Sequence, residues 1–164
     1  MDAMRRAFVG AAVGWAAALP AAAFAATHAR ADSLPLTLAF FAYAAGSAVC
    51  HQRPERSFFL WAAQMPVCAR CTGIYLGAAV AAVTASGFRR RAEHLARSVA
   101  AARGTLLLAA VPTAATLVYE WTTGIMPSNV LRAGSGLLLG AAVAVLVIGS
   151  LAPGAAVRVP NSHS

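Results

Sequence analysis

Three cysteines and a histidine are the residues of this chain whose types and spacing point most directly to chemistry. Cys50 is followed by His51, and Cys68 and Cys71 form a Cys-x-x-Cys pair further along. Three thiolates and one imidazole make up a tetrahedral zinc ligand set, and Cys-x-x-Cys is a common chelating half of such sites. The sequence therefore predicts a metal site at these four residues, with zinc as the expected ion.

The same residues allow two other interpretations. Cys68 and Cys71 alone can form a redox-active or structural disulfide, which would make the protein a membrane thiol–disulfide oxidoreductase. Alternatively, the cysteines are small buried hydrophobic residues without a chemical role, and His51 caps a helix C-terminus. An odd number of cysteines argues against a disulfide scaffold but does not decide among these interpretations.

Arginines surround the cysteines in the sequence. Guanidinium groups bind phosphates and carboxylates through paired hydrogen bonds, so several of them near one another predict an anion pocket for phosphate or an anionic lipid headgroup. A single arginine at a helix end more often extends to the headgroups. With neutral donors included, the predicted anion site comprises Arg53, Arg56, Arg70, Arg132, Ser57, Ser128 and Asn129.

Glu120 is an acidic residue within an otherwise apolar segment. Ionisable groups at membrane depth are costly and are therefore candidates for function. Catalysis or proton transfer is one interpretation of Glu120. The other is a structural ion pair with Arg132, and the sequence leaves both open.

The composition indicates that membrane helices position these residues. Of the 164 residues, 60% are hydrophobic and 11% are charged, and the mean hydropathy is +0.68. A soluble domain has about a quarter charged residues. The net charge of +8 comes from arginines that lie between apolar runs, which favours membrane lipid rather than nucleic acid as the partner.

Five segments approach the roughly 20 apolar residues that a membrane-spanning helix needs. The predicted fold is all-α, a polytopic bundle of about five spans with a four-helix core of two hairpins and one extra N-terminal span. Pro66 is expected in the first turn of the third span. The expected spans are 7–26, 34–50, 67–87, 105–121 and 131–151.

The predicted organisation has three regions. Residues 1–33 form the N-terminal span and its connection, 34–151 the core with the Cys/His/Arg motifs, and 152–164 a polar tail. The first region also resembles a signal peptide, because Arg5 and Arg6 precede an apolar stretch that ends near an Ala-x-Ala sequence.

Arginines also predict the orientation in the cell membrane. Connections rich in arginine stay in the cytoplasm, so residues 89–103 are expected to be cytoplasmic and the connections 51–66 and 122–130 extracytoplasmic. Arg5 and Arg6 argue for the reverse orientation if all five segments span the membrane. The arginines of the third connection are Arg89, Arg90, Arg91, Arg97 and Arg103.

Two segments of the chain, 72–81 and 135–144, are similar in sequence and predict a duplicated helical unit whose copies run parallel. Each copy contains Gly-x-x-x-Gly, which lets helices approach closely. These glycines are assigned to helix packing. Alternatively, such glycine faces join copies of the chain into a homo-oligomeric transporter or channel subunit. The four glycines are Gly73, Gly77, Gly136 and Gly140.

At these motifs the chain resembles the small bacterial and archaeal membrane proteins catalogued as domain of unknown function 2085. The resemblance rests on Cys-His-Gln-Arg-Pro-Glu-Arg-Ser-Phe at 50–58, Pro-Val-Cys-Ala-Arg-Cys-Thr-Gly-Ile-Tyr-Leu-Gly at 66–77 and Ser-Asn-Val-Leu-Arg at 128–132. It extends over roughly 34–151 and implies a membrane protein without naming an activity. The family pattern has Asp-Gly where this chain has Glu120-Trp121.

Overall fold

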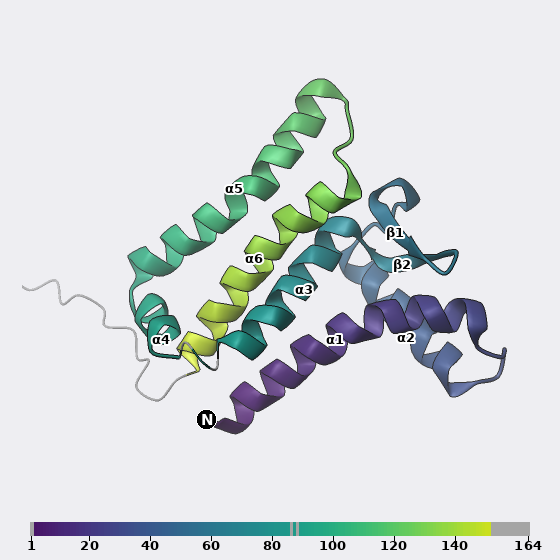
Figure 1. Cartoon of the computed structure of the whole chain (residues 1–164), viewed down its shortest axis with the longest axis horizontal. Coiled ribbons are helices and arrows are strands. Elements are labelled where there is room, and N and C mark those ends of the chain that lie inside the picture. Colours follow the sequence, from purple (N-terminus) through teal and green to yellow (C-terminus); the bar gives the residue numbers. More distant parts are fainter. Residues whose placement is uncertain (1, 86, 88, 152–164) are drawn as a thin grey trace, which may run out of the picture.

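The apolar segments form helices in the computed structural model, which describes residues 2–85, 87 and 89–151. The described part holds six α-helices, a short 3-10 helix and one antiparallel hairpin (Figure 1). The tail 152–164 lies outside it. The elements are α1 (Asp2–His28), α2 (Leu34–Val49), η1 (Pro54–Arg56), β1 (Ser57–Leu60), β2 (Ala63–Cys68), α3 (Ala69–Thr84), α4 (Arg89–Arg97), α5 (Val99–Thr123) and α6 (Asn129–Ser150).

Three helices of the described part, α1, α5 and α6, are long and apolar enough to cross a membrane. The helices α2 and α3 have 16 residues each, which is about 24 Å at 1.5 Å per residue. A bilayer's hydrocarbon core is about 30 Å thick. The predicted helical membrane bundle is thus confirmed in its helical character, whereas five full spans are not confirmed.

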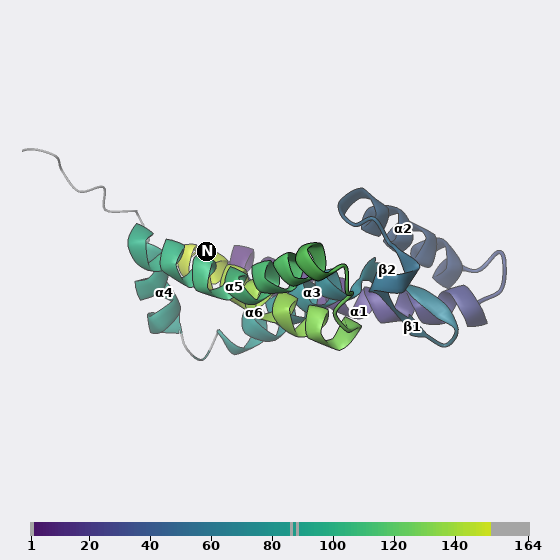
Figure 2. The ribbon, with the colours of Figure 1, turned by 90° about the horizontal axis from the view of Figure 1, so that it is seen from above.

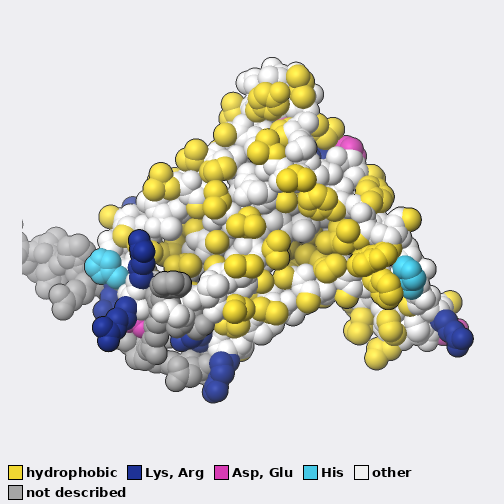
Figure 3. All heavy atoms as spheres, in the orientation of Figure 1, with side chains coloured by type: hydrophobic (Ala, Val, Ile, Leu, Met, Phe, Trp, Pro, Cys, Tyr) yellow, Lys and Arg dark blue, Asp and Glu magenta, His cyan; other side chains and the backbone are white. Residues whose placement is uncertain are grey.

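The outer surface of the helices is apolar. Leu107 and Leu108 of α5 and Val130 of α6 are among many large hydrophobic side chains exposed on the outside. Figure 3 shows such side chains spread over the whole face, while the Arg side chains in view gather mainly at the end where α4 lies. The apolar part of this surface is suited to the lipid hydrocarbon, and the end that bears the arginines is suited to the headgroups.

The two repeated segments pack against each other as parallel helices. A Cβ atom on Gly73 would lie 1.9 Å from the carbonyl oxygen of Ala133, and one on Gly136 would lie 2.2 Å from that of Arg70. Arg70 and Ala133 are counterparts in the repeat, as the two glycines are. The contacts of α3 and α6 are therefore reciprocal, as across a two-fold axis.

The second pair of repeat glycines makes the same kind of reciprocal contact between α3 and α6. Gly77 packs on the backbone of Leu137, and Gly140 packs on that of Ile74, the repeat counterpart of Leu137. The four glycines therefore serve contact between two helices of one chain. Their faces are occupied within the chain, and the homo-oligomer stays a prediction.

The helix α1 packs within the bundle rather than beside it. Its start, at Phe8 and Val9, packs against Ala82 of α3 and Ala85 just after that helix, and its later part, at Leu19, lies near the cysteines. It thus runs antiparallel to α3. The N-terminal end of α1 and the helix α4 consequently lie at the same end of the bundle (Figure 1).

The helix α2 does not form the expected core hairpin with α3. Its Ala39 and Ala42 pack against Ala22 and Ala25 of α1, and its Gly46 lies against the backbone of Pro66 in β2. Figure 2 shows α2 beside the later part of α1, away from α5 and α6. The arrangement of two core hairpins plus an added span is therefore wrong for the first hairpin.

The connection 51–66 is a β-hairpin rather than a loop. Strand β1 pairs with β2 in the register Phe59 with Gln64 and Leu60 with Ala63. Trp61 and Ala62 make the turn with φ of 51° and 63°, the left-handed values that a tight hairpin turn requires. Pro66 lies in β2 and not in a helix, so α3 begins only after Cys68.

Capping residues fix the ends of α5 and α6 next to this hairpin. Gly124, with φ of 69°, ends α5, and its N–H donates to the carbonyl of Glu120. The Ser128 hydroxyl accepts a hydrogen bond from the N–H of Leu131 and so caps α6. The Asn129 amide donates to the carbonyl of Ser57 at 2.9 Å. The connections 51–66 and 122–130 therefore lie at the same end, as predicted.

Candidate functional site

The three cysteines meet where α2, β2 and α3 join. Cys50 follows the last residue of α2, Cys68 ends β2 and caps α3, and Cys71 lies in the first turn of α3. Their sulfur atoms all lie within 4.8 Å of one another. All three thiols are free; Cys50 is buried and the others are half-buried.

A network of amide side chains holds Cys50 against the hairpin. The Gln52 side chain donates to the carbonyls of Tyr43 and Pro66 at 2.9 and 2.6 Å. The Gln64 side chain donates to the carbonyl of Gln52, and the Tyr43 hydroxyl donates to that of Gln64. These residues tie the chain that follows α2 to β2. Sequence reasoning missed them, although Gln52 is part of the family pattern.

The surroundings favour the thiolate form of Cys68. The backbone N–H of Cys68 donates to the Cys50 sulfur at 3.2 Å, which joins the two residues. The α3 N-terminus adds its positive dipole end. A hydrogen bond from the Cys71 thiol, with a smaller one from Cys50, lowers the pKa of Cys68 to about 5 although burial opposes the shift.

The donor set fits a zinc ion. With Zn–S bonds of about 2.3 Å in a tetrahedron, the sulfurs lie about 3.8 Å apart, which agrees with three sulfurs grouped within 4.8 Å. His51 lines the same cavity but is exposed and stands outside this group of ligand atoms. The structure thus brings together three of the four predicted ligands.

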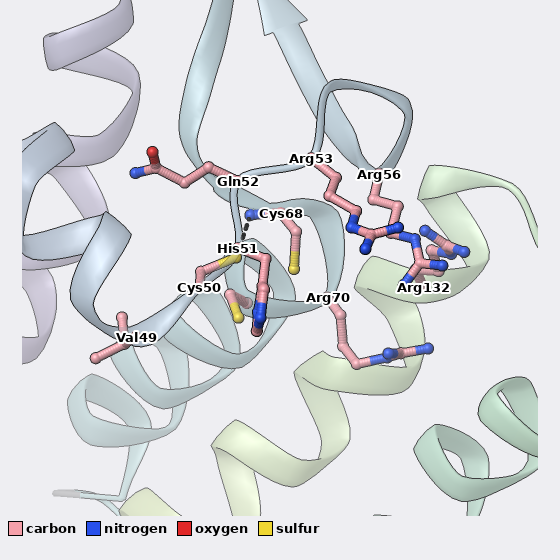
Figure 4. A pocket seen from close by; sticks show the side chains of 10 residues that line it. Val49, Cys50, His51, Gln52, Arg53, Arg56, Cys68, Arg70 and Arg132 are labelled. Atoms are coloured by element: carbon pink, nitrogen blue, oxygen red, sulfur yellow. Dashed lines mark hydrogen bonds between the residues drawn. The ribbon is translucent and has the colours of Figure 1, made fainter.

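A cavity of about 370 Å³ joins the cysteines to the arginines. Figure 4 shows the guanidinium groups of Arg53, Arg56 and Arg132 on one side of it and the sulfurs on the other. All four predicted arginines line this cavity. The full lining is Val49, Cys50, His51, Gln52, Arg53, Arg56, Cys68, Arg70, Cys71 and Arg132.

The predicted neutral donors do not line the cavity. Ser128 caps α6 and Asn129 binds the carbonyl of Ser57, as described above. The Ser57 hydroxyl donates to the carbonyl of Arg53 at 2.8 Å. These three side chains have structural contacts that hold the hairpin against α6, and thereby position the arginines.

Glu120 lies between two of the arginines. Its Oε2 accepts from Arg132 at 2.8 Å and its Oε1 from Arg56 at 2.5 Å. The ion pair with Arg132 was one of the two sequence interpretations, and it is present. Arg56 as a second partner was not foreseen, because it lies on a different segment of the chain, in η1.

Residues 50–146 match the sequence profile of a family described as predicted membrane proteins, DUF2085. This chain belongs to the DUF2085 family. The match includes every cysteine and every cavity arginine, whereas α1 precedes it. The resemblance found in the sequence motifs is thereby confirmed.

Two archaeal relatives of this DUF2085 protein are described as uncharacterized proteins. A protein of Methanocaldococcus jannaschii is 58% identical over 38 residues, which is 23% of this chain and 24% of the relative. A protein of Methanothermobacter thermautotrophicus is 38% identical over 102 residues, 60% of this chain and 83% of the relative. No solved structure matches the chain.

Proposed function

We propose that this protein binds a zinc ion at one membrane face through the thiolates of Cys50, Cys68 and Cys71. The observation that carries the proposal is that the Cys50 sulfur, from the end of α2, lies within 4.8 Å of both sulfurs of the Cys-x-x-Cys pair. A disulfide uses only two of them. Tetrahedral zinc uses three or four, and soft thiolate ligands favour metals such as zinc over magnesium or calcium.

We assign the fourth position to His51. It follows Cys50 directly, lines the same cavity, and its exposed side chain has room to turn toward the sulfurs. With His51 bound, the centre is closed and structural, and it fastens α2 to α3. Zinc supplies Lewis-acid chemistry only if a solvent molecule holds the fourth position instead.

We further propose that the zinc site faces the outside of the cell. The arginines of α4, together with Arg5 and Arg6 of α1, lie at the opposite end of the bundle from Cys50. Arginine-rich ends are retained in the cytoplasm. The conflict between the N-terminal arginines and residues 89–103 disappears when both groups lie at one end.

A thiol–disulfide oxidoreductase is the alternative function, and the lowered pKa of Cys68 supports it. A Cys-x-x-Cys at a helix N-terminus with a stabilised thiolate is the arrangement of redox-active pairs. The third sulfur weighs against it, because a redox pair has no need of Cys50 in the group.

Metal analysis of the purified protein tests the proposal. About one zinc per chain is expected from the stoichiometry of a tetrahedral site. Cys50→Ser, Cys68→Ser, Cys71→Ser and His51→Ala should each reduce zinc content, while Thr72→Ala, which alters a neighbouring side chain only, should retain it. Protein without metal, in which one thiol is free and two react only after reduction, would support the oxidoreductase instead.

A further inference from the structure

We infer that the four arginines of the cavity bind a phosphoryl group, carried by a lipid headgroup or by a soluble phosphorylated compound. This goes beyond the zinc site, which uses the thiols on the other side of the cavity. The inference rests on the hydrogen-bonding state, charge and exposure of Arg53, Arg56, Arg70 and Arg132.

Three of these arginines have donors without a partner among the residues that the structure describes. The Nε atoms of Arg56, Arg70 and Arg132 are buried and make no hydrogen bond to the described part of the chain. Buried polar groups are nearly always hydrogen-bonded. All three side chains line the cavity, and because their Nε atoms are covered, an acceptor-rich ligand would bind their guanidinium groups through the terminal N–H donors.

The cavity also has an excess of positive charge. Glu120 binds Arg56 and Arg132, and exposed Glu55 lies 4.0 Å from Arg53. The contact found for Arg70 in the described residues is the neutral Thr116 hydroxyl, at 3.1 Å. Four guanidinium groups thus face two carboxylates. A phosphoryl group, with its charge and several acceptor oxygens, complements this set.

The cavity is open at one end and closed at the other. The exposed fraction of the side chain falls from 58% in Arg53 to 36% in Arg56 and 3% in Arg132. Arg132 lies in the first turn of α6, where the positive dipole end favours anions. A headgroup can therefore enter past Arg53 and place its phosphate near Arg132.

The size and lining of the cavity favour a ligand larger than orthophosphate. Its volume of about 370 Å³ is in the range of sites for small organic molecules. Exposed Val49 lines it beside the arginines, so an apolar part of the ligand also finds a surface. A phospholipid has both parts.

Isothermal titration of the full-length protein in neutral detergent tests this inference. Dioctanoyl phosphatidic acid is compared with dioctanoylglycerol, which has the same acyl chains and no phosphate. Glycerol 3-phosphate provides the soluble arm. Phosphatidic acid should bind and dioctanoylglycerol should not. If glycerol 3-phosphate binds with the same Kd as phosphatidic acid, the ligand is a soluble compound. If it binds much more weakly than phosphatidic acid, the ligand is a lipid. Either result supports recognition of the phosphoryl group.

Substitutions then test the arginines. Arg70→Gln removes a charge without leaving a carboxylate unpaired, and should weaken binding about tenfold to hundredfold, the usual effect of losing a charged hydrogen bond. Arg53→Gln, at an exposed position, should also weaken binding and provides a variant whose folding is not at risk. Arg103→Gln, exposed at the opposite end of α5, is the matched control and should leave Kd unchanged.

Three results would overturn the inference. The first is equal binding of the two lipids, and the second is equal Kd values for the Arg70→Gln, Arg53→Gln and Arg103→Gln proteins. The third is loss of phosphatidic acid binding after chelator treatment that leaves the thermal midpoint unchanged, which would assign the phosphate to a metal rather than to the arginines. Absence of zinc from the purified protein would refute the metal proposal alone.

Discussion

Glu120 is held between two guanidinium groups where neighbouring helices shield it from water. Its exposed fraction is 9% and that of the Arg132 side chain is 3%. Removing one member of a buried ion pair leaves a charge without compensation, which costs about 3–5 kcal/mol. The triad of Arg56, Glu120 and Arg132 therefore joins η1, α5 and α6 at the cavity.

We predict that Glu120→Gln lowers the thermal midpoint of the protein in detergent. It leaves the buried Arg132 without a carboxylate, and a loss of about 3–5 kcal/mol follows from comparable pairs. Adding Arg132→Gln should recover part of the stability, because the unpaired charge is then gone. Thermal unfolding followed by circular dichroism measures both.

Glu55→Gln is the matched control for this prediction. Glu55 is exposed and lies 4.0 Å from Arg53, and exposed ion pairs contribute at most about 1 kcal/mol. If the effects of Glu120→Gln and Arg132→Gln simply add, the two residues do not stabilise each other, and Glu120 becomes a candidate for proton transfer.

Among the elements, α3 and α6 pack most closely and form the centre of the fold. Their backbones approach so closely that a Cβ on Gly140 would lie 1.9 Å from the carbonyl oxygen of Ile74. The site depends on this contact, because α3 holds Cys71 and Arg70 and α6 holds Arg132. Any separation of the two helices widens the cavity.

We predict that Gly140→Ala destabilises the protein by about 1–3 kcal/mol, the usual cost of overpacking. Gly134→Ala on the same helix is the control, because nothing lies within 4 Å of its Cβ position. Alanine there should be neutral or stabilising by up to about 1 kcal/mol through helix propensity. Equal thermal midpoints for the two variants would show that α3 and α6 do not pack through Gly140.

The sequence predicted the apolar helices and the cysteines, His51 and arginines of the cavity, but neither Gln52 nor the hairpin β1–β2. Trp61 and Ala62 form its turn, and neither is a residue typical of left-handed turns. Pro66 is more common at a helix start than inside a strand. The pairing of Glu120 with Arg56 links residues 64 positions apart, and no local pattern indicates such a contact.

For the molecule as a whole, the placement of α2 against α1 bears on how often the chain crosses the membrane. Because α2 packs on α1 and β2, we propose that it does not cross and that four helices connect the two ends: α1, α3, α5 and α6. The N-terminal arginines and α4 then share one side. Five full crossings would place them on opposite sides.

Labelling of single introduced cysteines distinguishes these topologies. In a background with the native cysteines changed to serine, Met4→Cys and Arg91→Cys should react from the same side of the membrane, and Thr123→Cys from the other. The arginine distribution predicts that the first two are cytoplasmic. Labelling of Met4→Cys and Arg91→Cys from opposite sides would establish five crossings and contradict the arrangement of α1 and α2.

X-ray absorption at the zinc edge is the measurement that tests the central proposal most directly. For protein purified without added metal, we predict a spectrum with three sulfur neighbours at about 2.3 Å and one nitrogen at about 2.0–2.1 Å. In the His51→Ala protein the nitrogen should be lost while the three sulfurs remain. A zinc ion surrounded only by nitrogen and oxygen, or protein that contains no zinc, would contradict a metal centre built on Cys50, Cys68 and Cys71.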